Sequence, residues 1–166
     1  LLKYLPAVFY RIAFLTGEGP GFTIAVNDPQ QDFYGLTIPL SAPFAISESG
    51  LNQIYESPSA HLLSPGQPFN FTAKRKCNFL VANFFADPVS DYSRKLLQSD
   101  SREFPSLGSD VSFLTQTGSV LLRSIAKIWS AFNNRIPATK ITLTELEDDL
   151  LASFILYSNE NTKLRK

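Results

Sequence analysis

Four side chains in the first half of the sequence could recognise a small molecule: Arg11, Tyr34, Tyr55 and His61. His61 precedes a Ser-Pro-Gly-Gln-Pro turn at 64–68, where its imidazole could form a hydrogen bond to a ligand. Arg11 stands among apolar residues, so its guanidinium needs an acidic partner or an anionic ligand. The two tyrosines combine an apolar ring with a hydroxyl, as many ligand pockets do. These residues predict a binding site, and the alternatives are an internally satisfied histidine, an ordinary salt bridge and core or rim tyrosines.

The sequence offers few groups for metal or covalent chemistry. His61 is the only histidine and Cys77 is the only cysteine, so the usual ligands cannot build a zinc or non-haem iron site. A Gly-x-Ser-x-Gly motif is absent, and a catalytic triad would have to use His61. We therefore expect no catalytic residues, no metal and no cofactor.

Charge and hydropathy exclude several classes of protein. Fifteen basic and fifteen acidic residues give a formal net charge of zero, which argues against a surface built to bind nucleic acid. No apolar run approaches the roughly 20 residues of a membrane span, and the first residues lack the features of a secretory signal. We therefore expect a cytoplasmic protein without membrane contact. Because the chain contains no Met, even at position 1, we also expect it to be processed or part of a longer protein.

The first half of the chain is charge-poor, and its pattern predicts short strands. Up to Thr72 it has two basic and five acidic residues, whereas thirteen basic and ten acidic residues follow. Apolar and polar side chains alternate with period two between turns rich in Gly, Pro, Asn and Ser. Strands are expected near 8–15, 22–26, 34–40, 43–47, 51–56, 59–63, 69–72 and 78–85. About eight short strands at this spacing indicate a sandwich or barrel.

The second half changes to a helical period. Residues 88–98 are predicted as a short helix with Asp87 as its N-cap, and 118–133 as an amphipathic helix. A last helix is expected to begin at Thr142 or Thr144, each of which could form a capping box with an acidic residue three positions later. The two long helices should fold back on each other in antiparallel fashion.

Both long helices carry an apolar stripe with helical spacing. The first interpretation is that the stripes pack against each other and against the barrel. The second is that part of them binds a second copy of the chain, in a homodimer. The residues expected at that dimer interface are Leu121, Ile125, Ile128, Trp129, Leu146, Leu150 and Phe154.

The order of these features resembles the sensor domain of AraC-family transcription regulators. The resemblance rests on the stretch from His61 through the Pro-Gly turn to Phe69, on the segments 104–107 and 111–113, and on the helices through Trp129 and at 143–156. It implies a mainly β fold with α elements: a cupin-like double-stranded β-helix, or jelly-roll barrel, followed by an antiparallel pair of amphipathic helices. Residues 1–86 would form the barrel and 87–166 a helical dimerisation subdomain, together one compact sensor domain.

The resemblance also implies a function. A small-molecule effector, whose identity the sequence does not give, would bind in the barrel. Effector binding would favour one arrangement of barrel and helices, and the helices would transmit this arrangement to a helix-turn-helix DNA-binding domain that this chain lacks. The chain would therefore contact DNA only through that domain. Two alternatives from other classes are a metal-free cupin enzyme that uses tyrosines and His61, and a stand-alone ligand-binding module.

Overall fold

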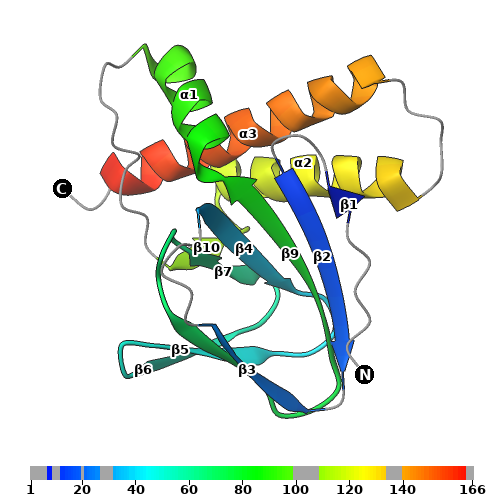
Figure 1. Cartoon of the computed structure of the whole chain (residues 1–166), viewed down its shortest axis with the longest axis vertical. Helices are drawn as coiled ribbons and strands as arrows, with labels where there is room; N and C mark the ends of the chain where they lie inside the picture. The colour runs from blue at the N-terminus through cyan, green and yellow to red at the C-terminus, as the bar shows by residue number, and fades with distance from the viewer. Residues whose placement is uncertain are drawn as a thin grey trace.

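Two antiparallel β-sheets and three helices make up the computed structural model, which describes residues 7–8, 12–19, 21–26, 32–98, 109–133 and 140–163 (Figure 1). The strands are β1 (Ala7–Val8), β2 (Ile12–Gly19), β3 (Phe22–Val26), β4 (Phe33–Pro39), β5 (Phe44–Glu48), β6 (Leu51–Tyr55), β7 (Ser59–Leu63), β8 (Phe69–Ala73), β9 (Cys77–Phe85) and β10 (Asp110–Ser112). One sheet has the order β1-β2-β9-β4-β7-β10 and the other β3-β8-β5-β6. The predicted fold class, a jelly-roll barrel followed by helices, is confirmed.

The six-stranded sheet lies between the other sheet and the helices, and its strands β4, β7 and β9 are mostly buried (Figure 1). Successive side chains of a strand point to opposite faces, so β9, in the interior of this sheet, contributes to two cores. In β9, Phe79 packs in the core between the two sheets, whereas Leu80 and Phe84 pack in the core beneath the helices. This explains why β9 is largely apolar on both of its faces.

The helices are α1 (Ala86–Leu97), α2 (Gln116–Asn133) and α3 (Lys140–Lys163), close to the predicted ranges. Two predicted caps are wrong. The N-cap of α1 is Phe85, without a side-chain cap, rather than Asp87. The last helix begins at Lys140, so Thr142 and Thr144 lie inside it and neither starts a capping box. The Thr-x-x-Glu pattern misleads here because no helix-breaking residue lies between Lys140 and Thr142, and the helix extends past the expected start.

Helices α2 and α3 run antiparallel and pack on the six-stranded sheet. Thr117 near the start of α2 donates a hydrogen bond to Glu160 near the end of α3, and the Ser124 and Ser153 hydroxyls meet midway at 2.9 Å. The ring of Phe154 stacks on Phe84 of β9, with centroids 4.2 Å apart and planes 7° apart. This packing fixes α3 on the sheet.

The residues expected at a dimer interface lie mainly inside this core. Leu121, Ile125, Ile128, Leu150 and Phe154 are at most 1% exposed within a single chain. Trp129 and Leu146 are half-buried against the same cluster. The structure therefore supports the first interpretation of the stripes for these positions, because the sheet beneath the helices supplies the apolar surface that each stripe requires.

Strand β10 was not predicted, because three residues are too few to show a period. It pairs antiparallel with β7, with Asp110 opposite His61, and thus extends the barrel sheet from a part of the chain that otherwise forms helices. The turn after β10 brings α2 very close: a Cβ added at Gly118 would lie 2.0 Å from the Ser112 carbonyl oxygen.

No described helix has the length and hydropathy needed to cross a membrane. Within the described ranges, no group of three or more His, Cys, Asp or Glu side chains is placed to hold a metal ion.

Candidate functional site

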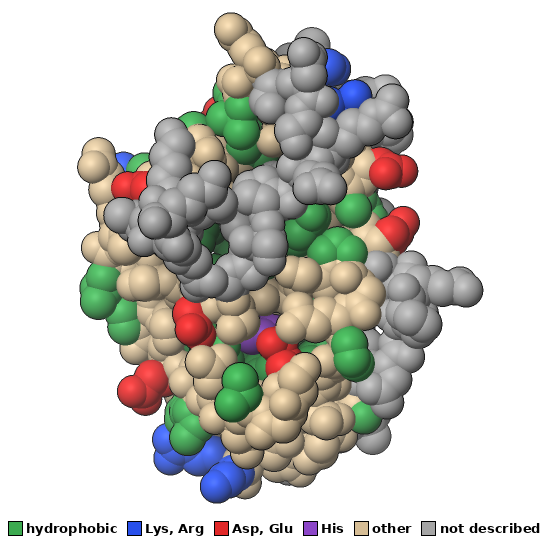
Figure 2. Space-filling view, turned by 90° about the vertical axis from the view of Figure 1, so that its left-hand side faces the viewer, with side chains coloured by type: hydrophobic (Ala, Val, Ile, Leu, Met, Phe, Trp, Pro, Cys, Tyr) green, Lys and Arg blue, Asp and Glu red, His purple; other side chains and the backbone are tan. Residues whose placement is uncertain are grey.

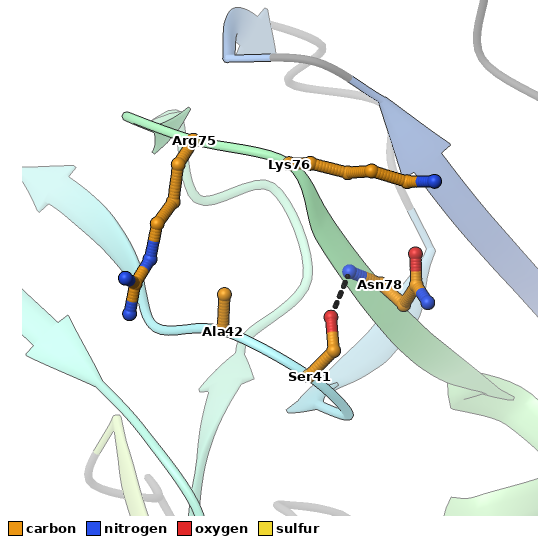
Figure 3. Close-up of a pocket in the computed structure, with 5 residues that line it drawn as sticks. All are labelled: Ser41, Ala42, Arg75, Lys76 and Asn78. Atoms are coloured by element: carbon orange, nitrogen blue, oxygen red, sulfur yellow. Dashed lines mark hydrogen bonds between the residues drawn. The ribbon is translucent and has the colours of Figure 1, made fainter.

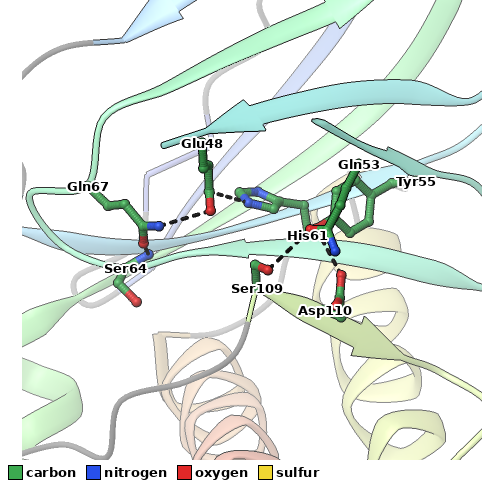
Figure 4. A network of polar contacts seen from close by, with 8 residues as sticks. All are labelled: Glu48, Gln53, Tyr55, His61, Ser64, Gln67, Ser109 and Asp110. Atoms are coloured by element: carbon green, nitrogen blue, oxygen red, sulfur yellow. Dashed lines mark hydrogen bonds and ion pairs between the residues drawn. The ribbon is translucent and has the colours of Figure 1, made fainter. Parts of the chain in front are cut away.

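His61 lies at the centre of a polar network between the two sheets (Figure 4). Its neighbours in β7, Ala60 and Leu62, face the helices, so the His61 ring faces the opposite sheet. The ring is 1% exposed, and its Nε2 atom lies 2.6 Å from Glu48 Oε1 at the end of β5. The network therefore joins a central strand of one sheet to the facing sheet.

The second carboxylate oxygen of Glu48 is held by the Pro-Gly turn. Gln67 Nε2 donates to Glu48 Oε2 at 2.9 Å, and the Ser64 amide donates a weak hydrogen bond to Gln67 Oε1 at 3.4 Å. Because both oxygens of Glu48 are engaged, the carboxylate has a fixed position. The turn that the sequence singled out therefore supplies one wall of the site.

On the other side of His61, Tyr55 of β6 connects the barrel to β10. The Tyr55 hydroxyl lies 2.8 Å from Gln53 Oε1 and 2.9 Å from Asp110 Oδ1, so its single proton can serve either acceptor. The Tyr55 ring meets His61 edge-on, with centroids 5.1 Å apart. Ser109, next to Asp110, reaches Gln53 Oε1 at 3.5 Å.

Burial dominates the titration of the two ring groups. Desolvation lowers the pKa of His61 from 6.5, although the Glu48 and Asp110 carboxylates act in the opposite direction. Desolvation and the same two carboxylates raise the pKa of Tyr55 far above its usual value. At neutral pH the imidazole is therefore uncharged. Its Nδ1 atom is buried and has no hydrogen-bond partner.

A pocket of about 270 Å³ opens beside this network. Its lining residues are Ile46, Glu48, Ser49, Leu51, Gln53, Gln67 and Ser109. Figure 2 shows, on this side of the molecule, a histidine side chain next to an acidic side chain in a recess of the surface. The arrangement can hold a small molecule through amide, hydroxyl and carboxylate groups.

The structure brings together two of the four predicted ligand-binding residues. His61 and Tyr55 belong to the network, and Tyr55 is also packed in the core between the sheets. Tyr34 does not belong to it, because Tyr34 has the same parity in β4 as Leu36 and therefore faces the helices, with its ring 5.8 Å from that of Phe154. Arg11 lies outside the residues that the structure describes.

Sequence reasoning missed the other polar members of the network around His61 and Tyr55. They are Glu48, Gln53, Gln67, Ser109 and Asp110. Two signals could have found some of them. Glu48 is an acidic residue that directly follows the predicted strand 43–47 in a charge-poor half, and Gln67 lies inside the conspicuous Pro-Gly turn. Asp110 has no comparable signal because its approach depends on the unpredicted β10.

A second pocket, of about 460 Å³, lies at the basic segment between β8 and β9 (Figure 3). Ser41, Ala42, Arg75, Lys76 and Asn78 line it, and the Asn78 amide donates to Ser41 Oγ at 2.9 Å. The charged ends of Arg75 and Lys76 point in different directions in Figure 3. Two cationic groups that diverge do not form a joint anion site, so the polar network beside His61 is the better candidate.

Comparisons with known proteins find similar folds but no similar sequence. No protein-family model matches the chain, and no curated protein matches it significantly. The crystal structure of the AraC-like transcriptional activator CuxR matches with a TM-score of 0.70 at 10% identity, over 94% of this chain and 55% of that chain. The present chain thus spans about half the length of the activator.

Two cupin structures match about half of this chain. A cupin superfamily protein from Desulfitobacterium hafniense has a TM-score of 0.46 at 9% identity, over 51% of this chain and 78% of that chain. The cupin domain of an XRE family transcriptional regulator from Enterobacter cloacae has a TM-score of 0.45 at 9% identity, over 51% and 96%.

The match to the activator covers nearly the whole chain at 10% identity, so the similarity is in the arrangement of barrel and helices. The chain therefore has the fold of a β-barrel with attached helices that is also found in an AraC-like transcriptional activator.

Proposed function

We propose that this chain is the effector-binding and dimerisation part of an AraC-type transcription regulator, and that it is not an enzyme. The observation that supports this most is the likeness to the activator CuxR over 94% of the chain, because it includes the helices as well as the barrel. Such a regulator would contact DNA through a separate domain and would act in the cytoplasm, as a homodimer. We propose residues 1–86 as the barrel unit and 87–166 as the helical unit of one sensor domain.

The mechanism would be a shift of population between arrangements of barrel and helices. A ligand in the pocket beside His61 would contact Glu48, Gln53 and Gln67. Gln53 lies within hydrogen-bond distance of the Tyr55 hydroxyl, which also reaches Asp110 in β10. Strand β10 in turn donates its Ser112 amide to the Tyr157 hydroxyl of α3 at 3.2 Å. The path from pocket to helix therefore consists of a few hydrogen bonds and the backbone of β10.

In a homodimer the interface would use the outer surface of the helices. Leu121, Ile125 and Phe154 point into the core, but Val120, Leu122 and Leu156 are large apolar residues that are 42%, 37% and 47% exposed. Sedimentation equilibrium tests this part: a dimer is expected, and a monomer at high concentration would contradict it.

The sensor function is tested by joining the end of the chain to a DNA-binding domain that works only as a dimer. Operator occupancy in cells should then differ between growth conditions that change the pool of small metabolites. Glu48→Gln should remove this difference, and Glu56→Gln, at an exposed position outside the network, should keep it. Constant occupancy under all conditions would refute the proposal, and turnover lost with His61→Ala would favour an enzyme instead.

A further inference from the structure

The pocket beside His61 contains an unbalanced negative charge. Glu48 is only 15% exposed, and both of its carboxylate oxygens accept hydrogen bonds, from His61 and from Gln67. Neither partner is a cation at neutral pH, because burial lowers the pKa of His61 and Gln67 carries an amide. Among the described residues that line the pocket, none is Lys or Arg.

An ionised carboxylate withdrawn from water is costly unless a positive charge accompanies it. Two hydrogen bonds stabilise the Glu48 anion in part, but they leave its charge uncompensated. Asp110 adds a second carboxylate near the pocket, where it accepts from Tyr55. The electrostatic potential of this region is therefore negative. A positively charged ligand would compensate it.

The other groups of the site are mainly acceptors or neutral. Gln53 Oε1 is an acceptor within reach of the Tyr55 and Ser109 hydroxyls, and the Nδ1 atom of His61 is buried without a partner. An anionic ligand would meet like charge here. A neutral polyol could form hydrogen bonds, but it would not compensate the carboxylate.

The size of the pocket limits the ligand further. About 270 Å³ lies just below the range of roughly 300–1,000 Å³ typical of sites for drug-sized molecules. The pocket therefore fits a small metabolite and not a polymer segment. Ile46 and Leu51 provide apolar surface for a short carbon chain.

We propose that the effector of this protein is a small organic cation, a molecule with a protonated amine that pairs with Glu48 and a short polar body that contacts Gln53, Gln67 and Ser109. This inference rests on the proposed sensor function, because it names the chemical class of that effector. Once the amine is in place, the Glu48 carboxylate has a cationic partner and the negative potential of the pocket is reduced.

The test compares three probes of similar length that differ in charge: 4-amino-1-butanol, 1,4-butanediol and 4-hydroxybutyrate. The imidazole NMR signals report binding directly, because His61 is the only histidine in the chain. The amine should shift these signals saturably and bind at least about tenfold more tightly than the diol, as expected for one added charge pair in a partly buried site. The hydroxy acid should leave them unchanged.

The matched variants are Glu48→Gln, which removes the charge and keeps the shape, and Glu56→Gln, which removes an exposed charge outside the network. Glu48→Gln should abolish the preference for the amine, whereas Glu56→Gln should retain it. A preference that survives Glu48→Gln overturns the proposal. If this variant does not fold, the salt dependence of binding to the wild-type protein tests the proposal instead. Added salt should weaken binding of the amine and not of the diol.

The outcomes separate this inference from the proposed function. If the diol or the hydroxy acid binds as tightly as the amine, the cation proposal is wrong and a ligand-binding sensor remains. If none of the three binds, the cation proposal is wrong, and the operator-occupancy experiment described above decides the effector-binding function.

Discussion

The Tyr55 hydroxyl lies 2.9 Å from the Asp110 carboxylate, although 55 residues separate them in the chain. This contact joins β6, in the four-stranded sheet, to β10, at the edge of the six-stranded sheet. Strand β10 also contacts α3 through Ser112 and Tyr157. One short strand therefore connects the candidate pocket with the helices.

A double-mutant cycle measures this connection. Tyr55→Phe and Asp110→Ala should each destabilise the protein, and together they should cost less than the sum of the two. The coupling free energy should be about 1.5–3 kcal/mol, the usual contribution of a hydrogen bond to a charged group. Urea denaturation of the four proteins gives the value. A coupling free energy near zero would show that the bond contributes nothing.

The stability of the protein should fall below neutral pH because of His61. The folded protein resists protonation of this imidazole, whereas the unfolded chain takes up a proton near its usual pKa of 6.5. The unfolding free energy should therefore decrease as the pH falls through 6.5 toward the lower pKa of the folded state. His61→Gln should lose most of this dependence between about pH 8 and pH 5.5.

The pKa of His61 itself is measurable by NMR without interference from other imidazoles. It should lie below 6.5, and it should fall further in Glu48→Gln, because the Glu48 and Asp110 carboxylates raise it against the effect of burial. Tyr55 also faces the ring but stays neutral throughout this range. A pKa at or above 6.5 in the wild-type protein would refute the assignment of a neutral, buried imidazole.

Gly118→Ala should disrupt the junction of β10 and α2. The added Cβ would lie 2.0 Å from the Ser112 carbonyl oxygen and 2.8 Å from Thr115 Oγ1, so the backbone must move. We expect a loss of stability of about 3 kcal/mol, as for severe overpacking. Lys127→Ala, at an exposed position of the same helix, serves as the control and should change thermal unfolding little.

Phe154→Ala distinguishes a core residue from an interface residue. Because Phe154 is fully buried and stacks on Phe84, its truncation should destabilise the single chain by about 4 kcal/mol. Leu156→Ala, on the outer side of α3, should cost only about 0.5 kcal/mol in the monomer. Denaturation at low protein concentration checks both values, and an equally small effect of Phe154→Ala would contradict the packing described above.

Much of the fold follows from local pattern. Period-two alternation between Gly- and Pro-rich turns predicted eight of the ten strands, and helical periodicity predicted three helices near their observed ranges. Those features depend on neighbours in the chain. The caps at Asp87 and Thr142 failed because the start of a helix depends on what the preceding segment can pack against, which a short motif does not contain.

In the candidate site, too, some features follow from the sequence and others depend on the tertiary structure. The sequence alone determined that the chain has one imidazole, a charge-poor barrel half and too few ligands for a usual metal site, since these are matters of composition. Only the tertiary structure decided that Tyr34 faces the helices and that Glu48, Gln67 and Asp110 meet near His61 and Tyr55. Strand pairing and the closure of two sheets bring these groups together across long separations, and the free energy of such contacts depends on burial that no local pattern specifies.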